Sequence, residues 1–218
     1  SDVYKRQLSH SVRPTKYVEI NNFYTATVYE KSAELIRMLK TIIGREKFLE
    51  GMDQFFKNQD GCACTLEDFQ EAFEYVLDKN LDKFFKWFHE PGTPKLIVSE
   101  KYVGKNYKVT FRQEKPMKSG KYSNKVMPIT YKILSSKGHF LQQKKTLVLD
   151  KKTSSIELKN QNEKPAISVL NSFSAPVLVE FKQPIDDLFS ILEFETDFTS
   201  IWMAKKKLDY VALEKIAC

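Results

Sequence analysis

Polar and aromatic side chains crowd one short stretch, residues 21–31, and their chemistry is suited to lining a cleft. The stretch reads NNFYTATVYEK and brings together carboxamide, phenol and carboxylate groups, all of which form hydrogen bonds. From Val28 onward, apolar residues recur with the period of an α-helix. Asn21, Tyr24 and Tyr29 are therefore expected at the entrance of a helix, where their side chains could line a binding site.

The helix that would position these groups is predicted to end at Gly44. Glu30 and Glu34 fall near its start, where negative charge interacts favourably with the helix dipole. Gly44 follows the last periodic residue, which is typical of a helix C-terminus. The apolar face comprises Val28, Leu35, Ile36, Leu39, Ile42 and Ile43. The pattern alone predicts a polar, aromatic-rich helix start and does not identify its function.

Several blocks of the sequence resemble, in the same order, the zinc aminopeptidase N family, in particular its bacterial-type branch. The most specific of them is the stretch 21–31. The further blocks are residues 10–14, Trp87 with residues 92–94, residues 171–177, and residues 196–198 with Trp202. Ser32 stands where the family usually has glycine. The resemblance extends over nearly the whole chain after Gln7.

By this resemblance, Tyr29 matches the family's catalytic tyrosine. A protonated phenol can donate a hydrogen bond to the oxyanion that forms when a peptide carbonyl is attacked. Asn21 and Tyr24 match positions that line the first specificity pocket, and Glu30 matches a neighbour of that pocket that could orient Tyr29. The alternatives are a core tyrosine that caps the helix, loop packing for Asn21 and Tyr24, and a solvated glutamate at a helix start.

Zinc is the cofactor that the resemblance implies, but its ligands are not in this sequence. The family's zinc is held by two histidines of an H-E-x-x-H motif and a downstream glutamate. The three histidines here are His10, His89 and His139, and no two are four residues apart. The zinc ligands, the general base and the glutamates for the substrate amine are therefore expected upstream of residue 8, and this chain alone is predicted to be inactive. Cys62 and Cys64 lack a second pair of ligands and are expected to be ordinary thiols.

Length and composition limit the class of protein. The 218 residues are 42% hydrophobic, which is enough for packed cores and argues against disorder throughout. The sequence has no long uninterrupted apolar run, so no membrane span is predicted. The net charge of +7 comes with lysines scattered through every segment, which favours solvated surfaces over a nucleic-acid interface. Three cysteines without a disulfide pattern favour a reducing compartment, and the cytoplasm is the predicted location.

The predicted fold class is α+β, with parts of several domains in one fragment. Helices are predicted at residues 46–57, after Thr65 in a capping-box sequence, and at residues 81–88. Beyond residues 91–94, with their two prolines and a glycine, the apolar period falls to two, which predicts short strands. The strands are expected at residues 95–100, 107–111, 127–133, 146–149, 155–158, 166–169 and 177–181. Helical spacing returns after Pro184, with Asp197 as a helix cap.

By resemblance, this order of helices, strands and helices corresponds to three domains of the family. Residues 8–93 would be the helical end of a thermolysin-like catalytic domain, residues 94–183 an antiparallel β-sandwich, and residues 184–218 the start of an α-helical domain. Residues 1–7 match no part of the family and are predicted to be a non-native leader.

The predicted function is therefore that of a fragment of a zinc metallo-aminopeptidase, which hydrolyses N-terminal residues from peptides. Its expected partners are peptide substrates and the remainder of its own polypeptide, with neither nucleic acid nor membrane. The alternative is a non-catalytic interaction module made of helices and a β-sandwich, and a third reading is a basic nucleic-acid binder. The resemblance of several blocks favours the enzyme.

Overall fold

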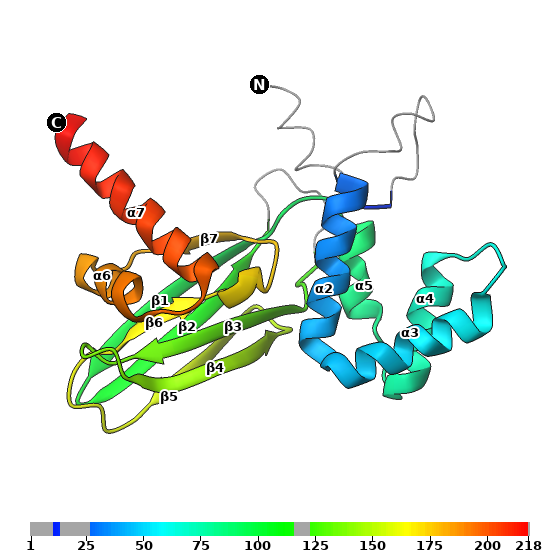
Figure 1. Ribbon diagram of the computed structural model, residues 1–218, viewed down its shortest axis with the longest axis horizontal. Coiled ribbons are helices and arrows are strands. Elements are labelled where there is room, and N and C mark those ends of the chain that lie inside the picture. Colours follow the sequence, from blue (N-terminus) through cyan, green and yellow to red (C-terminus); the bar gives the residue numbers. More distant parts are fainter. Residues whose placement is uncertain (1–10, 14–26, 116–122, 218) are drawn as a thin grey trace. The chain divides into compact units, whose positions relative to one another are not determined.

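The chain divides into two compact units. The residues described in the computed structural model are 11–13, 27–115 and 123–217 (Figure 1). The first unit consists of Ser1–Thr93 and Lys115–Met127, and the second of Pro94–Glu114 and Pro128–Cys218. The first unit is therefore discontinuous in sequence, because the chain returns to it after building part of the second.

The first unit is helical in its described part. Its elements are the π-helical turn η2 (Thr27–Lys31) and the helices α2 (Ser32–Ile43), α3 (Arg45–Gln59), α4 (Leu66–Leu77) and α5 (Asp82–His89) (Figure 1). The helical period of the sequence predicts these four α-helices, and the structure confirms them. The main difference lies at the start of α2, where residues predicted as the first α-helical turn form a π turn.

Short-range capping signals set two of the helix ends. Gly44 has a φ of 85°, in the left-handed region that glycine adopts at little steric cost, and its N–H donates to the Lys40 carbonyl at 2.9 Å. At the start of α4 the Asp68 N–H donates to Thr65 Oγ1 at 3.2 Å, and the Thr65 N–H donates to Asp68 Oδ2 at 2.7 Å. Both the helix end at Gly44 and the capping box at Thr65 are confirmed.

An aromatic core holds the helices of the first unit together. Phe73, Phe85 and Trp87 are almost fully buried, and the ring centroids of Phe69 and Phe73 lie 4.7 Å apart. Gly51 allows α3 to approach α4 closely, because a Cβ atom at this position would lie 2.5 Å from the Phe73 ring. Burial of these rings removes apolar surface from water, which is the main force holding helices together.

The second unit contains two β-sheets. Their strands are β1 (Lys95–Val103), β2 (Asn106–Glu114), β3 (Met127–Leu134), β4 (Phe140–Leu149), β5 (Thr153–Leu158), β6 (Ala166–Val169) and β7 (Leu178–Phe181). One sheet has the order β5-β2-β1-β7 and the other the order β4-β3-β6. The rings of Phe111 on β2 and Tyr131 on β3 lie 6.3 Å apart, so the two sheets face each other across a buried core. The predicted β-sandwich is confirmed.

Two features of the sheets differ from the prediction. β1 pairs with β7 in parallel, with Lys95 opposite Leu178, whereas the prediction is an antiparallel sandwich. Alternation of apolar and polar residues identifies a strand but not its direction. β4 begins at Phe140, well before the predicted residues 146–149, and its middle residues are exposed on both faces. These residues show no alternation because neither side of this edge strand is buried there.

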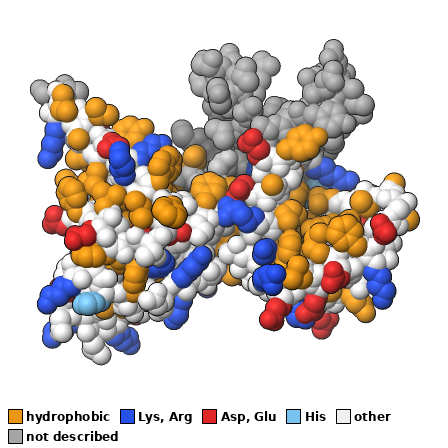
Figure 2. Space-filling model, in the orientation of Figure 1, with side chains coloured by type: hydrophobic (Ala, Val, Ile, Leu, Met, Phe, Trp, Pro, Cys, Tyr) orange, Lys and Arg blue, Asp and Glu red, His pale blue; other side chains and the backbone are white. Residues whose placement is uncertain are grey.

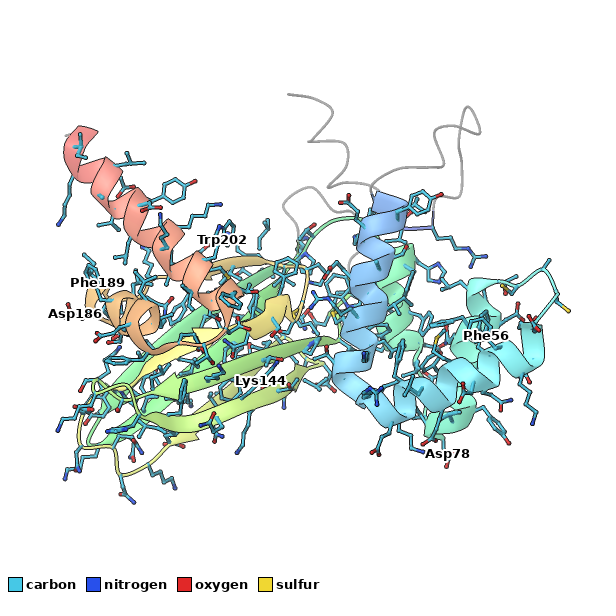
Figure 3. All side chains as sticks on the ribbon, in the orientation of Figure 1. Phe56, Asp78, Lys144, Asp186, Phe189 and Trp202 are labelled. Carbon is cyan, nitrogen blue, oxygen red and sulfur yellow. The ribbon has the colours of Figure 1, made fainter. Side chains whose placement is uncertain are left out.

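Two helices follow the sheets, α6 (Ile185–Phe194) and α7 (Phe198–Ala217). A small core joins them, formed by Leu188, Ile191 and Ala204. Elsewhere the two helices expose hydrophobic side chains (Figure 2), including Phe189 at 56% and Trp202 at 60% exposure (Figure 3). Within the described ranges, no helix has both the length and the apolar character needed to cross a membrane.

Candidate active site

The π-helical turn η2 carries Tyr29 immediately before α2. Turns of this kind are rare and are found frequently at functional sites. Tyr29 is 60% exposed, so it lies at the surface and not in the aromatic core of the unit. A phenol in this position is able to contact a substrate.

Ser32 accounts for the shape of the turn. Its hydroxyl donates to the Val28 carbonyl, four residues earlier in the chain. A serine that bonds to this carbonyl competes with the helical hydrogen bonds and distorts the helix locally. The α-helix predicted from Val28 therefore begins only at Ser32, and the preceding residues form a wider turn. Buried Leu35, Met38 and Leu39 fix α2 itself and so hold the turn in place.

The other predicted site residues are only partly within the described structure. Glu30 is exposed in η2, next to Tyr29 in the chain. Asn21 and Tyr24 lie outside the described residues. The structure therefore places Tyr29 and Glu30 in one surface turn, and the roles predicted for all four residues stay predictions.

Lys31, the last residue of the same turn, is not among the residues that the sequence predicts for the site. Its Nζ donates to the Gly92 carbonyl at 3.3 Å, just beyond the end of α5. Burial, and then the nearby charge of Lys125, lower the pKa of Lys31 to about 8. Two stretches that resemble the family, residues 21–31 and 92–94, thus meet through this contact. Lys31 and Gly92 are 61 positions apart in the sequence, which explains why no local pattern predicts the contact.

A buried ion pair fixes the end of α5 beside this contact. Lys125 Nζ donates to Glu90 Oε2 at 2.6 Å and to the Lys86 carbonyl at 2.9 Å, and the Lys125 side chain is 1% exposed. Glu90 also accepts hydrogen bonds from the N–H and the hydroxyl of Ser123, at 3.1 and 2.8 Å. Burial alone would raise the pKa of Glu90, but the hydrogen bonds from Lys125 and Ser123 hold it below its ordinary value.

Two further stretches that resemble the family, residues 171–177 and 196–198, take part in a polar network in the second unit. Asp197 accepts hydrogen bonds from the N–H and the hydroxyl of Ser172, both at 2.8 Å. It also accepts one from the Ser200 N–H at 3.0 Å, which confirms its predicted role as the cap of α7. Asn171 Nδ2 donates to Ser168 Oγ at 3.0 Å and to Ser200 Oγ at 2.6 Å. This network links the end of β6 to the start of α7.

Glu195 and Lys132 form a buried ion pair in the same network. The Glu195 side chain is 0% exposed and the Lys132 side chain 10% exposed. The Ser168 hydroxyl donates to Glu195, and so does the Thr196 N–H, at 2.7 Å. Burial alone would raise the pKa of Glu195, but the hydrogen bonds from Lys132 and Ser168 hold it below its ordinary value. The network buries its charges and pairs them, which suits it to fixing the fold and not to reacting with a substrate.

The described residues do not form a zinc site. Across residues 11–13, 27–115 and 123–217, no three His, Cys, Asp or Glu side chains gather as ligands for a metal ion. Cys62 and Cys64 are free, exposed thiols. The donor groups in this part of the chain therefore do not fit the zinc that the resemblance implies, and no step of a reaction is assigned to a metal held by them.

Two protein families match successive parts of the chain. Residues 1–88 match the Peptidase family M1 domain, and residues 92–182 match a domain of unknown function, DUF3458, described as having an Ig-like fold. Residues 1–7 fall within the first range and outside the described structure, so their predicted origin as a leader stays a prediction.

Several relatives with curated names are aminopeptidases. The chain is 34% identical over 212 residues to aminopeptidase N of Haemophilus influenzae and 32% identical over 221 residues to aminopeptidase N of Escherichia coli. Each alignment covers 92% of this chain and 24% of the relative. Among solved structures, the whole chain matches 25% of aminopeptidase A of Legionella pneumophila in complex with aspartic acid, with a TM-score of 0.87 and 31% identity.

These matches define the chain as part of a peptidase-family domain followed by an Ig-like domain. They place it in peptidase family M1, among relatives of aminopeptidase N. The chain spans about a quarter of the length of these curated relatives, with 24% of each covered.

Proposed function

We propose that the chain is part of a zinc-dependent aminopeptidase and supplies the tyrosine that stabilises the oxyanion during hydrolysis of an N-terminal peptide bond. The observation that carries this proposal is the placement of Tyr29, whose exposed ring lies in a π-helical turn. The turn falls within the sequence block most specific for the family. The names of the relatives support the same class of reaction.

In the proposed reaction, attack on the peptide carbonyl moves negative charge onto its oxygen. The Tyr29 phenol donates a hydrogen bond to this oxygen and stabilises the transition state more than the bound substrate. Because the sequence contains no H-E-x-x-H motif, the metal, its ligands and the general base are proposed to lie in polypeptide outside this chain. The chain by itself is accordingly expected to be inactive.

The first residue of the substrate is proposed to bind beside Tyr29. Asn21 and Tyr24 would line the pocket for its side chain, since aromatic walls suit apolar or basic side chains. Glu30, exposed in the same turn, would orient Tyr29. Peptides are the proposed substrates, and the cytoplasm is the proposed location.

The rest of the same polypeptide is the proposed partner of this chain. Exposed hydrophobic side chains on α6 and α7, among them Phe189 and Trp202, support the packing of further helices against residues 184–218. These residues would begin the α-helical domain, after the helical end of the catalytic domain in residues 8–93 and the β-sandwich domain in residues 94–183. Neither a nucleic acid nor a membrane is proposed as a partner.

Replacement of Tyr29 tests the proposal. In the full-length polypeptide, Tyr29→Phe removes only the hydroxyl, and kcat for release of the N-terminal residue from a chromogenic peptide should fall about 10²- to 10³-fold. KM should change little, because the lost hydrogen bond forms mainly in the transition state. A zinc chelator should abolish the wild-type activity.

Tyr75→Phe is the matched control, since Tyr75 is another exposed tyrosine of the first unit. It should leave kcat unchanged. If Tyr29→Phe kept kcat as close to the wild-type value as Tyr75→Phe does, the role assigned to Tyr29 would be wrong.

A further inference from the structure

The turn that carries Tyr29 also sends a lysine side chain toward the interior of the same unit. Lys31 is partly buried, and its Nζ donates to the Gly92 carbonyl at 3.3 Å. Burial leaves the Lys31 ammonium group less well solvated than that of an exposed lysine, and this burial, with the charge of Lys125, lowers the pKa of Lys31 to about 8. A cation in such a place needs a compensating partner, and the carbonyl of Gly92 is one.

The partner of Lys31 is itself held firmly. Gly92 follows Glu90 by two residues, and Glu90 accepts hydrogen bonds from Lys125 at 2.6 Å and from Ser123 at 2.8 Å. Lys125 is almost fully buried and donates in addition to the Lys86 carbonyl at 2.9 Å. The end of α5 is therefore a fixed point to which the contact from Lys31 ties the turn.

Tyr29 depends on this turn for its position. Tyr29 is 60% exposed, so packing against the core contributes less to fixing it than it does for a buried tyrosine. The backbone of η2, which carries the side chain, therefore contributes to where the hydroxyl lies. That backbone is fixed by the bond of Ser32 to the Val28 carbonyl and, from the far end of the turn, by the contact of Lys31 with Gly92.

We propose that Lys31 is a positioning residue for the reaction, whose contact with the Gly92 carbonyl holds the turn so that the Tyr29 hydroxyl reaches the oxyanion. This inference rests on the proposed function of Tyr29. Lys31 does not touch the substrate and acts through Tyr29. A displacement of about 1 Å can cost up to about a hundredfold in rate, so loss of this contact is expected to slow the chemical step.

A double-mutant cycle in the full-length polypeptide tests this coupling, with Lys31→Met, Tyr29→Phe and the double variant. Lys31→Met should lower kcat about 10- to 100-fold and leave KM within about threefold of the wild type. In the Tyr29→Phe background the same change should alter kcat by less than about threefold, since the hydroxyl that Lys31 positions is already absent. Lys31→Arg should recover most of kcat, because arginine keeps a cationic donor. Lys57→Met, at an exposed lysine of the first unit, should leave kcat unchanged.

Each result of this cycle decides one question. If Lys31→Met keeps wild-type kcat, or lowers kcat equally in both backgrounds, Lys31 does not position Tyr29 and the inference is overturned. If Tyr29→Phe itself keeps wild-type kcat, the proposed function fails instead. Circular dichroism confirms that each variant is folded, and Lys31→Ala, which also lacks a side-chain donor, replaces Lys31→Met in the cycle if the methionine variant does not fold.

Discussion

The turn around Tyr29 and the network around Glu195 both lie in or next to sequence that resembles the aminopeptidase N family, but they differ in exposure. Tyr29 is 60% exposed, whereas Glu195 is 5% exposed and pairs with Lys132. A group that acts on a substrate must be reachable, whereas a buried charge whose hydrogen bonds are taken up by its neighbours is suited to holding those neighbours together. The comparison shows that resemblance of a sequence block indicates a shared structure, and that exposure separates a candidate reactive group from a structural one.

The largest change in stability is expected for Glu195→Ala in the second unit. This variant leaves Lys132 buried without its counter-charge, and removal of one partner of a buried ion pair costs about 3–5 kcal/mol. Urea unfolding followed by circular dichroism measures the change in the free energy of unfolding.

Glu180→Ala is the control for this prediction. Glu180 pairs with Lys95 at 2.8 Å on the surface of the same unit, where an ion pair contributes little to stability. If Glu195→Ala and Glu180→Ala lowered the free energy of unfolding equally, the buried ion pair would contribute no more to stability than the surface pair.

Acid is expected to weaken the network. The folded pKa of Glu195 lies below its ordinary value of about 4.3, so the paired carboxylate contributes stability above that pH and loses it as the pH falls through the lower folded pKa. The free energy of unfolding should therefore fall as the pH drops below the ordinary glutamate pKa of about 4.3. Glu195→Gln should make this fall shallower than in the wild type, and equal slopes would show that Glu195 titrates alike in the folded and unfolded chains.

The smallest effect on stability is expected at the turn, for Ser32→Ala. Alanine favours the helix but removes the hydrogen bond to the Val28 carbonyl, so the free energy of unfolding should change by less than about 1 kcal/mol. In the full-length polypeptide kcat should nevertheless fall several-fold, because the turn relaxes toward an ordinary α-helix. If Ser32→Ala caused a large loss of stability and left kcat unchanged, the turn would serve to hold the fold and not to position Tyr29.

The sequence predicts those parts of the fold that a few neighbouring residues determine. Thr65 and Asp68 form the predicted capping box, and Gly44 ends α2 as expected. The first half of β4 and the parallel direction of β7 could not be predicted in the same way. Both depend on pairing within the sheets, which leaves no local signal in the chain.

The same contrast between local and long-range signals applies to the candidate site. The pattern around Tyr29 predicts only a polar helix start, and its proposed role comes from the resemblance of the surrounding block. The contact between Lys31 and Gly92 and the ion pair between Lys132 and Glu195 join residues 61 and 63 positions apart. Such pairings arise from the packing of elements, so inspection of either partner in the sequence does not find them.

The route of the chain between the two units has a consequence for how such proteins can be recombined. After β2 the chain comes back to the helical unit, where Val126 accepts a hydrogen bond from Trp87 Nε1 at 2.7 Å and Lys125 donates to the Lys86 carbonyl. If the genes of two relatives were joined at a single crossover near Thr93, α5 would come from one parent. Residues 115–127, which contact α5, would come from the other parent. Exchange of the Ig-like part alone would need further crossovers on both sides of residues 115–127, so the two units are not independent modules joined end to end.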